Sequence, residues 1–180
     1  MPFQLCTDYE PVILIELSGT LSDAELAAMS TEVTELLKLQ QATRVRAAVV
    51  LDFSTASAIA PHQRKTIGEW RRDVRELTSQ VCVGMAMVVK TPLIRGVLTA
   101  IGWFSPEPVP VVYMSSLEDA INWSIDACEK SGLSVPAQVV RRLKGIGWMR
   151  QQEAKPPEHS GTHVSSERDS TKRRHARVVR

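Results

Sequence analysis

Short runs of consecutive apolar residues alternate along the chain with longer stretches in which apolar residues recur every three or four positions. Apolar runs that do not alternate with polar residues are typical of strands covered on both faces of a parallel sheet. The first run is preceded by a short segment that we expect to pair with it at the edge of the sheet. The predicted strands are Phe3–Tyr9, Val12–Thr20, Arg46–Phe53, Val81–Val89 and Val109–Met114.

Each of the intervening stretches begins with a helix-start signal. Ser22-Asp-Ala-Glu25 and Ser116-Leu-Glu-Asp119 are capping boxes, and Thr91-Pro92 pairs an N-cap threonine with a proline in the first turn. Pro61 fits the first turn of another helix, and Gly132 ends the last one. The small residues from Ser54 to Ala60 predict a loop between a strand and this second helix.

The second helix has a narrow apolar seam and many cations. The seam consists of Ile67, Trp70, Val74 and Leu77. The cations are expected on the solvent-facing side; they are Arg64, Lys65, Arg71, Arg72 and Arg75. The alternation of strands and helices predicts an α/β fold, a mainly parallel four- to five-stranded sheet packed with about four helices.

Charge divides the chain unevenly. Residues 1–134 hold 11 Lys and Arg against 16 Asp and Glu, a net charge of −5, whereas residues 135–180 hold 11 against 4, a net charge of +7. We therefore divide the chain into a folded domain (1–133), a basic amphipathic segment (134–150) and a disordered basic tail (151–180). The tail serves either as a solvated extension or as an electrostatic arm for an anionic surface.

The composition excludes several classes of protein. No apolar run reaches the about 20 residues that a membrane-spanning helix needs. The N-terminus carries no basic stretch followed by a cleavage site, and Cys6, Cys82 and Cys128 are too far apart for a Cys-x-x-Cys site. We therefore expect a protein of the reducing cytoplasm without a metal or other cofactor.

Several short signatures resemble the SpoIIAA-like branch of the STAS family, which includes anti-sigma-factor antagonists and a looser group of stand-alone bacterial proteins. The resemblance covers roughly residues 5–130. It rests on the order of the elements and on Leu51-Asp-Phe-Ser54, Thr91–Trp103, Pro108–Met114 and Glu118–Trp123. It implies a STAS-like fold and a regulatory role in signalling, and members of the looser group are regarded as regulators or as carriers of small apolar ligands.

Classical antagonists of this family carry Asp-Ser-Ser/Thr-Gly at the start of the helix after the second core strand, and a partner kinase phosphorylates the hydroxyl. In this chain the matching position is Ala60-Pro61-His62-Gln63, which contains no hydroxyl. The resemblance therefore implies the fold without that phosphorylation switch.

Ligands of open α/β sheets bind past the carboxyl ends of the strands, where helix N-termini present free N–H groups. Two such ends carry polar residues that we take as candidates for ligand or partner binding. They are Ser54, Ser57 and His62 after one strand, and Lys90, Thr91 and Arg95 after the next. The alternative is that both are ordinary solvated loops.

Catalysis is not expected at these positions. His62 is the only histidine of the folded part, and no Gly-x-Ser-x-Gly turn or other nucleophile signature accompanies it. We therefore predict that the protein is not an enzyme.

Trp103 and Phe104 end the third predicted helix. Packing in the core is the default for such residues. The alternative is a hydrophobic lid: the helix from Leu93 to Phe104 would swing off the sheet and uncover an apolar pocket, and Trp103 is therefore included among the candidate binding residues.

Two functions follow from these observations. The first is a non-enzymatic regulatory or adaptor protein that acts by contact with a protein partner. That partner is either a different protein or a second copy of this chain. The alternative is a carrier or sensor of a small, lipid-like apolar ligand at the cytoplasmic membrane surface, with Arg141, Arg142, Lys144 and the last nine residues as a tether to anionic lipid. Sequence-specific nucleic-acid binding is not expected, because there is no recognition helix and no set of base-stacking aromatic residues.

Overall fold

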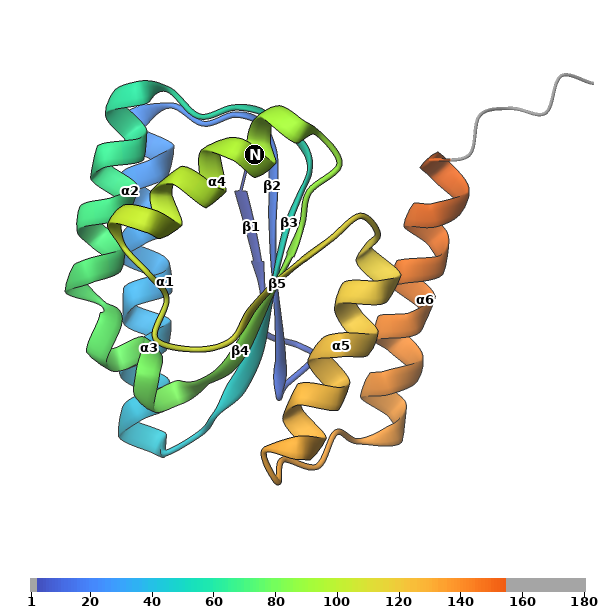
Figure 1. Ribbon diagram of the computed structural model, residues 1–180. Helices are drawn as coiled ribbons and strands as arrows, with labels where there is room; N and C mark the ends of the chain where they lie inside the picture. Colours follow the sequence, from blue (N-terminus) through green and yellow to red (C-terminus); the bar gives the residue numbers. More distant parts are fainter. Residues whose placement is uncertain (1–2, 155–180) are drawn as a thin grey trace, which may run out of the picture.

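The computed structural model describes residues 3–154 as one α/β unit (Figure 1). Its five strands are β1 (Phe3–Cys6), β2 (Val12–Thr20), β3 (Ala47–Ala58), β4 (Cys82–Val88) and β5 (Val111–Met114). Its six helices within the described residues are α1 (Asp23–Thr43), α2 (Pro61–Asp73), α3 (Arg75–Val81), α4 (Pro92–Phe104), α5 (Leu117–Lys130) and α6 (Ala137–Ala154).

The strands form a single sheet in the order β1-β2-β3-β4-β5. β1 is antiparallel to β2, and every other neighbouring pair is parallel. The α/β class and the mainly parallel sheet predicted from the sequence are thus confirmed. The helices outnumber the prediction because the second predicted helix is divided at Val74 and because the basic segment is itself helical.

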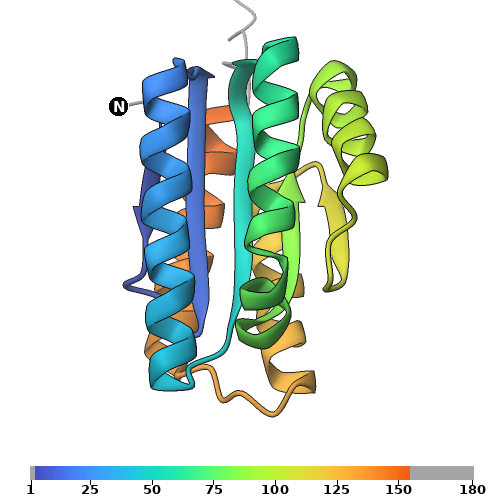
Figure 2. The same cartoon turned by 90° about the vertical axis from the view of Figure 1, so that its left-hand side faces the viewer.

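Helices cover both faces of the sheet, which explains why its central strands are apolar throughout. Alternate residues of β2 point to opposite faces: Leu14 packs under α5, whereas Ile13 and Ile15 face α1. α1, α2, α3 and α4 lie on one face, and α5 lies on the other with α6 outside it (Figure 1). The view in Figure 2 looks onto α1, α2 and α4 in front of the strands.

The segment from Ser54 to Ala60 is largely strand, so the predicted loop is wrong. β3 runs on to Ala58, where its last residues pair with the end of β2 through Ser18↔Thr55 and Thr20↔Ala58. The Thr55 hydroxyl also donates to the Leu17 carbonyl at 3.3 Å. The end of β2 supplies hydrogen-bond partners to the backbone groups of this segment, which in a free loop would have to bond to water.

α6 packs against α5. Val139 and Leu143 are buried in the core on that face, so the segment predicted to be amphipathic has an apolar side that packs on the domain. Residues 151–154 belong to α6 instead of the predicted tail. The rest of that tail, including the basic stretch from Lys172 to Arg180, lies outside the described residues.

Gly84 in the middle of β4 lets α5 approach the sheet closely. A Cβ atom at this position would lie 2.7 Å from Cη2 of Trp123 and 3.4 Å from the Pro110 carbonyl oxygen. Trp123 is therefore a packing residue of α5.

Candidate functional site: an apolar cavity with a polar end

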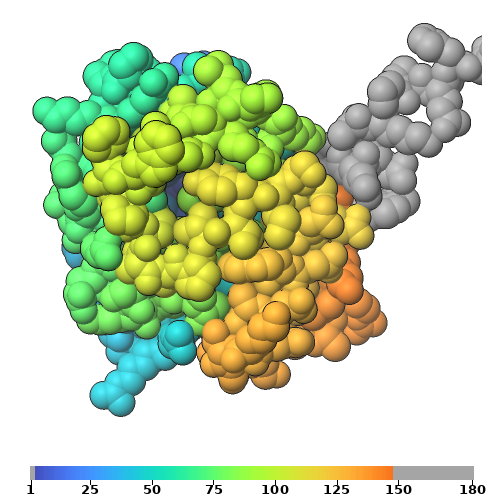
Figure 3. Space-filling view, in the orientation of Figure 1, coloured from blue at the N-terminus to red at the C-terminus, as the bar shows by residue number. Residues whose placement is uncertain are grey.

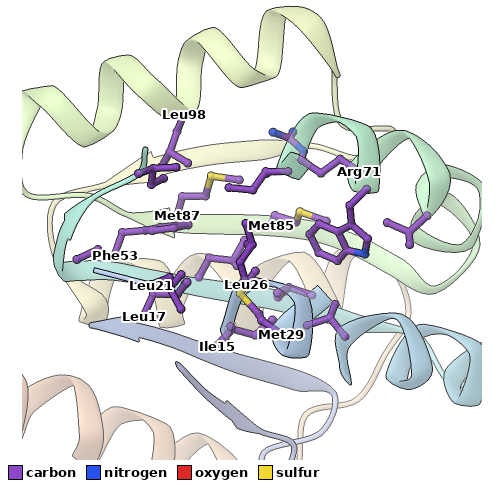
Figure 4. Close-up of a pocket in the computed structure, with 18 of the residues that line it drawn as sticks. Ile15, Leu17, Leu21, Leu26, Met29, Phe53, Arg71, Met85, Met87 and Leu98 are labelled. Carbon is purple, nitrogen blue, oxygen red and sulfur yellow. The ribbon is translucent and has the colours of Figure 1, made fainter. Parts of the chain in front are cut away.

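An apolar hollow of the described residues lies between one face of the sheet and the helices that cover it. It encloses about 130 Å³. Figure 4 shows aliphatic, aromatic and methionine side chains pointing into it from both layers. The lining includes Ile15, Leu17, Leu51, Phe53, Met85 and Met87 from the strands, and Leu26, Met29, Val33, Ile67, Trp70 and Leu98 from the helices.

Sequence periodicity places these side chains in the cavity. On α1 the lining residues Leu26, Met29, Val33, Leu37 and Gln40 are spaced by three and four positions, so they form one stripe. The same spacing continues through α2 and α3, where the lining residues are Gln63, Ile67, Arg71, Val74 and Thr78. On the strands every second residue faces this side, which gives Ile13, Ile15 and Leu17 on β2 and Val49, Leu51 and Phe53 on β3.

A largely buried ion pair borders the cavity. Nη2 of Arg71 lies 2.5 Å from Oε1 of Glu107, and the two side chains are only 11% and 12% exposed. Burial is the main reason why the pKa of Glu107 is raised, while the charge of Arg71 and its hydrogen bond oppose that rise. The prediction that Arg71 faces solvent is wrong, because Glu107 precedes β5 and supplies a carboxylate on the inner side of α2.

Two glutamines line the cavity and differ in their partners. Gln63 is satisfied: its Nε2 donates to the Leu21 carbonyl and to Oδ1 of Asp23, both at 2.9 Å, and its Oε1 accepts from the Ala60 N–H at 3.1 Å. Gln40 is 2% exposed, and neither its Nε2 nor its Oε1 has a hydrogen-bond partner within residues 3–154. Nε of Arg71 is likewise buried without a partner.

The cysteine that lines the cavity is chemically inert. Cys82 is 2% exposed, and burial raises the pKa of its thiol to about 12. A thiol with such a pKa is protonated at neutral pH, so it is a poor nucleophile and a poor metal ligand.

The candidate residues after β3 lie apart from one another. The Ser54 N–H donates to Oδ1 of Asp52 at 2.8 Å, and Ser57 is exposed on the extended end of the strand. His62 lies in the first turn of α2, and its Nε2 is 2.9 Å from Oδ1 of Asp23 at the start of α1. The hydrogen bonds from His62 and then from Gln63 lower the pKa of Asp23. His62 therefore joins two helix starts, and no serine of the part of the chain that the structure describes is bonded to it.

The candidate residues after β4 are exposed at the start of α4. The Thr91 hydroxyl accepts from the Ile94 N–H at 3.4 Å as the predicted N-cap. The guanidinium of Arg95 lies 5.9 Å from the centre of the Tyr113 ring, and Lys90 is exposed beside them. No bond of the described residues joins these three side chains into one site.

The aromatic end of α4 faces outward. Trp103 and Phe104 are each 80% exposed, and Leu93 at the other end of the helix is 68% exposed. The expected core packing of Trp103 and Phe104 is therefore wrong. The core-facing side of α4 is instead formed by Ile94, Val97, Leu98 and Ile101. Figure 3 shows α4 in yellow-green at the surface of the molecule.

Gln40, Arg71 and Glu107 were not among the residues predicted to matter. Two of them carry a signal in the sequence: Gln40 and Arg71 each occupy a position at which the apolar spacing of their helix continues. A polar residue in such a stripe is buried by its neighbours and needs a partner. Glu107 has no comparable signal, because it lies between an expected helix and strand.

The structure offers neither a metal site nor a membrane span in the part of the chain that it describes. No cluster of three or more His, Cys, Asp and Glu side chains there is arranged to hold an ion. None of the helices over residues 3–154 combines the length and apolar character needed to cross a bilayer.

Comparison with known proteins yields a likeness of fold alone. No family model matches the chain, and no curated protein is found as a relative. One similar solved structure is an uncharacterized protein of the DUF3478 family with a SpoIIAA-like fold from Shewanella loihica PV-4, at 11% identity and a TM-score of 0.46 over 68% of this chain and 91% of that one. Another is the anti-sigma factor antagonist SpoIIAA in its unphosphorylated form, at 15% identity and a TM-score of 0.47 over 73% of this chain and 98% of that one.

Proposed function

We propose that this protein is a non-enzymatic binding protein whose cavity takes up a small apolar molecule. The observation that carries the proposal is the cavity of about 130 Å³ between the sheet and α1, α2 and α4, lined almost entirely by aliphatic, aromatic and methionine side chains. Such a lining repels water and favours an apolar occupant.

The size of the cavity indicates the size of the ligand. A closed apolar cavity of roughly 150 Å³ in another protein stays dry and takes up benzene. The volume here, about 130 Å³, is close to that value. The ligand is therefore a single ring or a short alkyl chain, unless α4 moves outward to lengthen the space.

Filling the cavity should abolish uptake. Val33 lines the cavity and is half-buried, so a Val33→Phe substitution places a ring in the space that the ligand needs. We expect toluene to bind the full-length wild-type protein, and we expect the Val33→Phe variant to bind toluene at least about tenfold more weakly. An NMR titration that follows the indole signal of Trp70 measures both affinities.

The matched control is Val45→Phe. Val45 is 36% exposed and is not among the residues that line the cavity, so toluene affinity should stay at the wild-type value. Thermal unfolding of both variants establishes that they are folded. Absence of toluene binding to the wild-type protein, or equal binding to the Val33→Phe variant, would contradict the proposal.

A second candidate function is regulation through a protein partner. It is supported by the exposed apolar side chains of α4, namely Leu93, Trp103 and Phe104, since side chains of this size are usually withdrawn from water. Aromatic residues of this kind are also common at the centres of protein interfaces. A partner would then bind directly over the helix that covers one end of the cavity.

The second candidate is tested by removing the aromatic pair. A Trp103→Gln/Phe104→Gln variant should fail to retain a partner that the wild-type protein retains from a native extract, with the partner identified by mass spectrometry. The control is Leu39→Gln, because Leu39 is 60% exposed but lies on α1. Loss of the partner in both variants, or in neither, would count against α4 as the contact surface.

A further inference from the structure

We propose that the cavity selects ligands that combine a small apolar body with one uncharged hydroxyl or carboxamide group, which the Gln40 carboxamide binds. The inference rests on the proposed function, since it names the class of ligand that the same cavity takes. It places the polar group of the ligand at the opposite edge of the sheet from the strand ends that the sequence singles out.

Most of the polar groups that border the cavity lie toward the edge where the parallel strands begin, whereas Gln63 and Ser18 lie toward its other end. Gln40 lies in the last turns of α1 before β3, Thr78 lies in α3 just before β4, and Glu107 lies in the connection to β5. Figure 4 shows Arg71 at one end of the cavity, with Phe53 and Leu17 at the other. The unpaired polar groups of Gln40 and Arg71 therefore lie at the end of the cavity away from Phe53 and Leu17.

Gln40 is the uncharged side chain at this end whose donor and acceptor both lack partners among the described residues. Its side chain is withdrawn from solvent, and both its donor and its acceptor are unpaired, whereas Gln63 in the same cavity has its hydrogen bonds made within the protein. Burying an amide without a hydrogen bond is costly, and buried polar groups in folded proteins are rarely left in this state. A ligand group that both donates and accepts would satisfy the Gln40 carboxamide with two bonds.

The charges at this end favour an uncharged ligand. Arg71 is paired with Glu107, so the two side chains cancel one another. A carboxylate ligand would lose its hydration in an apolar cavity. It would also meet the Glu107 carboxylate, which already neutralises Arg71, the only cation among the described lining residues. A hydroxyl or carboxamide avoids both costs.

The experiment compares three ligands of nearly equal size: phenol, toluene and benzoate. We expect the wild-type protein to bind phenol about three- to tenfold more tightly than toluene, the range that one net hydrogen bond provides. Benzoate should bind more weakly than phenol. In Gln40→Leu, an apolar replacement of similar size, the preference for phenol over toluene should vanish while toluene affinity stays equal or rises.

Gln41→Leu is the control, because Gln41 is the exposed neighbour whose side chain contacts Gln80, and it should keep the preference. Gln40→Met provides a second apolar variant in case the first does not fold. Toluene binding without a preference for phenol, a preference that survives Gln40→Leu and Gln40→Met, or tighter binding of benzoate would each overturn this inference and leave the proposed function standing. If neither toluene nor phenol binds, the proposed function fails as well.

Discussion

Replacing Arg71 by methionine should lower the free energy of unfolding by about 3–5 kcal/mol, the cost of removing one member of a buried ion pair. The pair is well shielded, since Arg71 and Glu107 are 11% and 12% exposed. Without the guanidinium, Glu107 retains a buried charge that no longer has its cation. Urea unfolding of the full-length protein at pH 7 measures the loss.

The pH dependence of this loss has a defined sign. Burial already raises the pKa of Glu107, and removing Arg71 removes the charge that opposes the rise. An acid with a raised pKa in the folded state holds its proton more readily there than in the unfolded chain, so its contribution to stability decreases as the pH rises through the folded pKa. The Arg71→Met variant should therefore lose less stability at pH 5 than at pH 8.

Two further variants distinguish the loss of the ion pair from the loss of an exposed arginine on the helix surface. Arg72→Met changes the same side chain at an exposed neighbouring position and should alter stability by no more than about 0.5 kcal/mol. Arg71→Met combined with Glu107→Leu replaces both charges and should recover most of the loss, because the buried carboxylate is then gone. A single Arg71→Met variant as stable as Arg72→Met would show that the pair contributes little.

The architecture could be predicted because each element carries its own local signal. The apolar runs mark strands that are buried on both faces, and the Ser22 and Ser116 side chains cap their helices as the capping boxes predict. β4 begins and ends within one residue of the predicted strand, at Cys82 and Val88. Such patterns depend on neighbours within a few residues, which is the information that one sequence contains.

The extent of β3 and the environment of Arg71 could not be predicted in the same way. The strand residues after Ser54 are small, alternating Thr or Ser with Ala, and they become strand because the end of β2 lies beside them. Arg71 is buried because Glu107, 36 positions later in the sequence, comes to lie 2.5 Å away. Both outcomes depend on contacts between distant segments, which override local preference.

We predicted the ligand position from the rule that ligands of open α/β sheets bind past the carboxyl ends of the strands, but the cavity lies elsewhere. Lys90, Thr91 and Arg95 do stand past the carboxyl end of β4, where a helix N-terminus is available. The cavity instead lies beneath the helices, at the meeting of the stripes on α1 and on α2 and α3. Each stripe is visible in the sequence, but the space left between them depends on how the side chains pack.

Truncating Leu143 to alanine should destabilise the protein by about 2–5 kcal/mol, the range for removing most of a buried leucine side chain from a core. Leu143 of α6 is fully buried, at 0% exposed, in a cluster that includes residues of the sheet and α5. The helix is also joined to the first hairpin, because Arg142 lies 4.8 Å from the centre of the Tyr9 ring and Nη1 of Arg142 donates to the Asp8 carbonyl at 3.5 Å.

The control for this truncation is Lys144→Ala, an exposed position on the same helix that should change stability by no more than about 0.5 kcal/mol. Urea unfolding of the full-length variants measures both effects. The comparison decides whether residues 134–150 form a separate segment, as the charge distribution predicts, or complete the core of the domain. If α6 were an appendage, its loosening would leave the sheet intact, and the Leu143→Ala variant would unfold at the same urea concentration as Lys144→Ala. We expect that α6 completes the core. Because Leu143 is buried against α5 and the strands, α6 should unfold together with them in one cooperative transition.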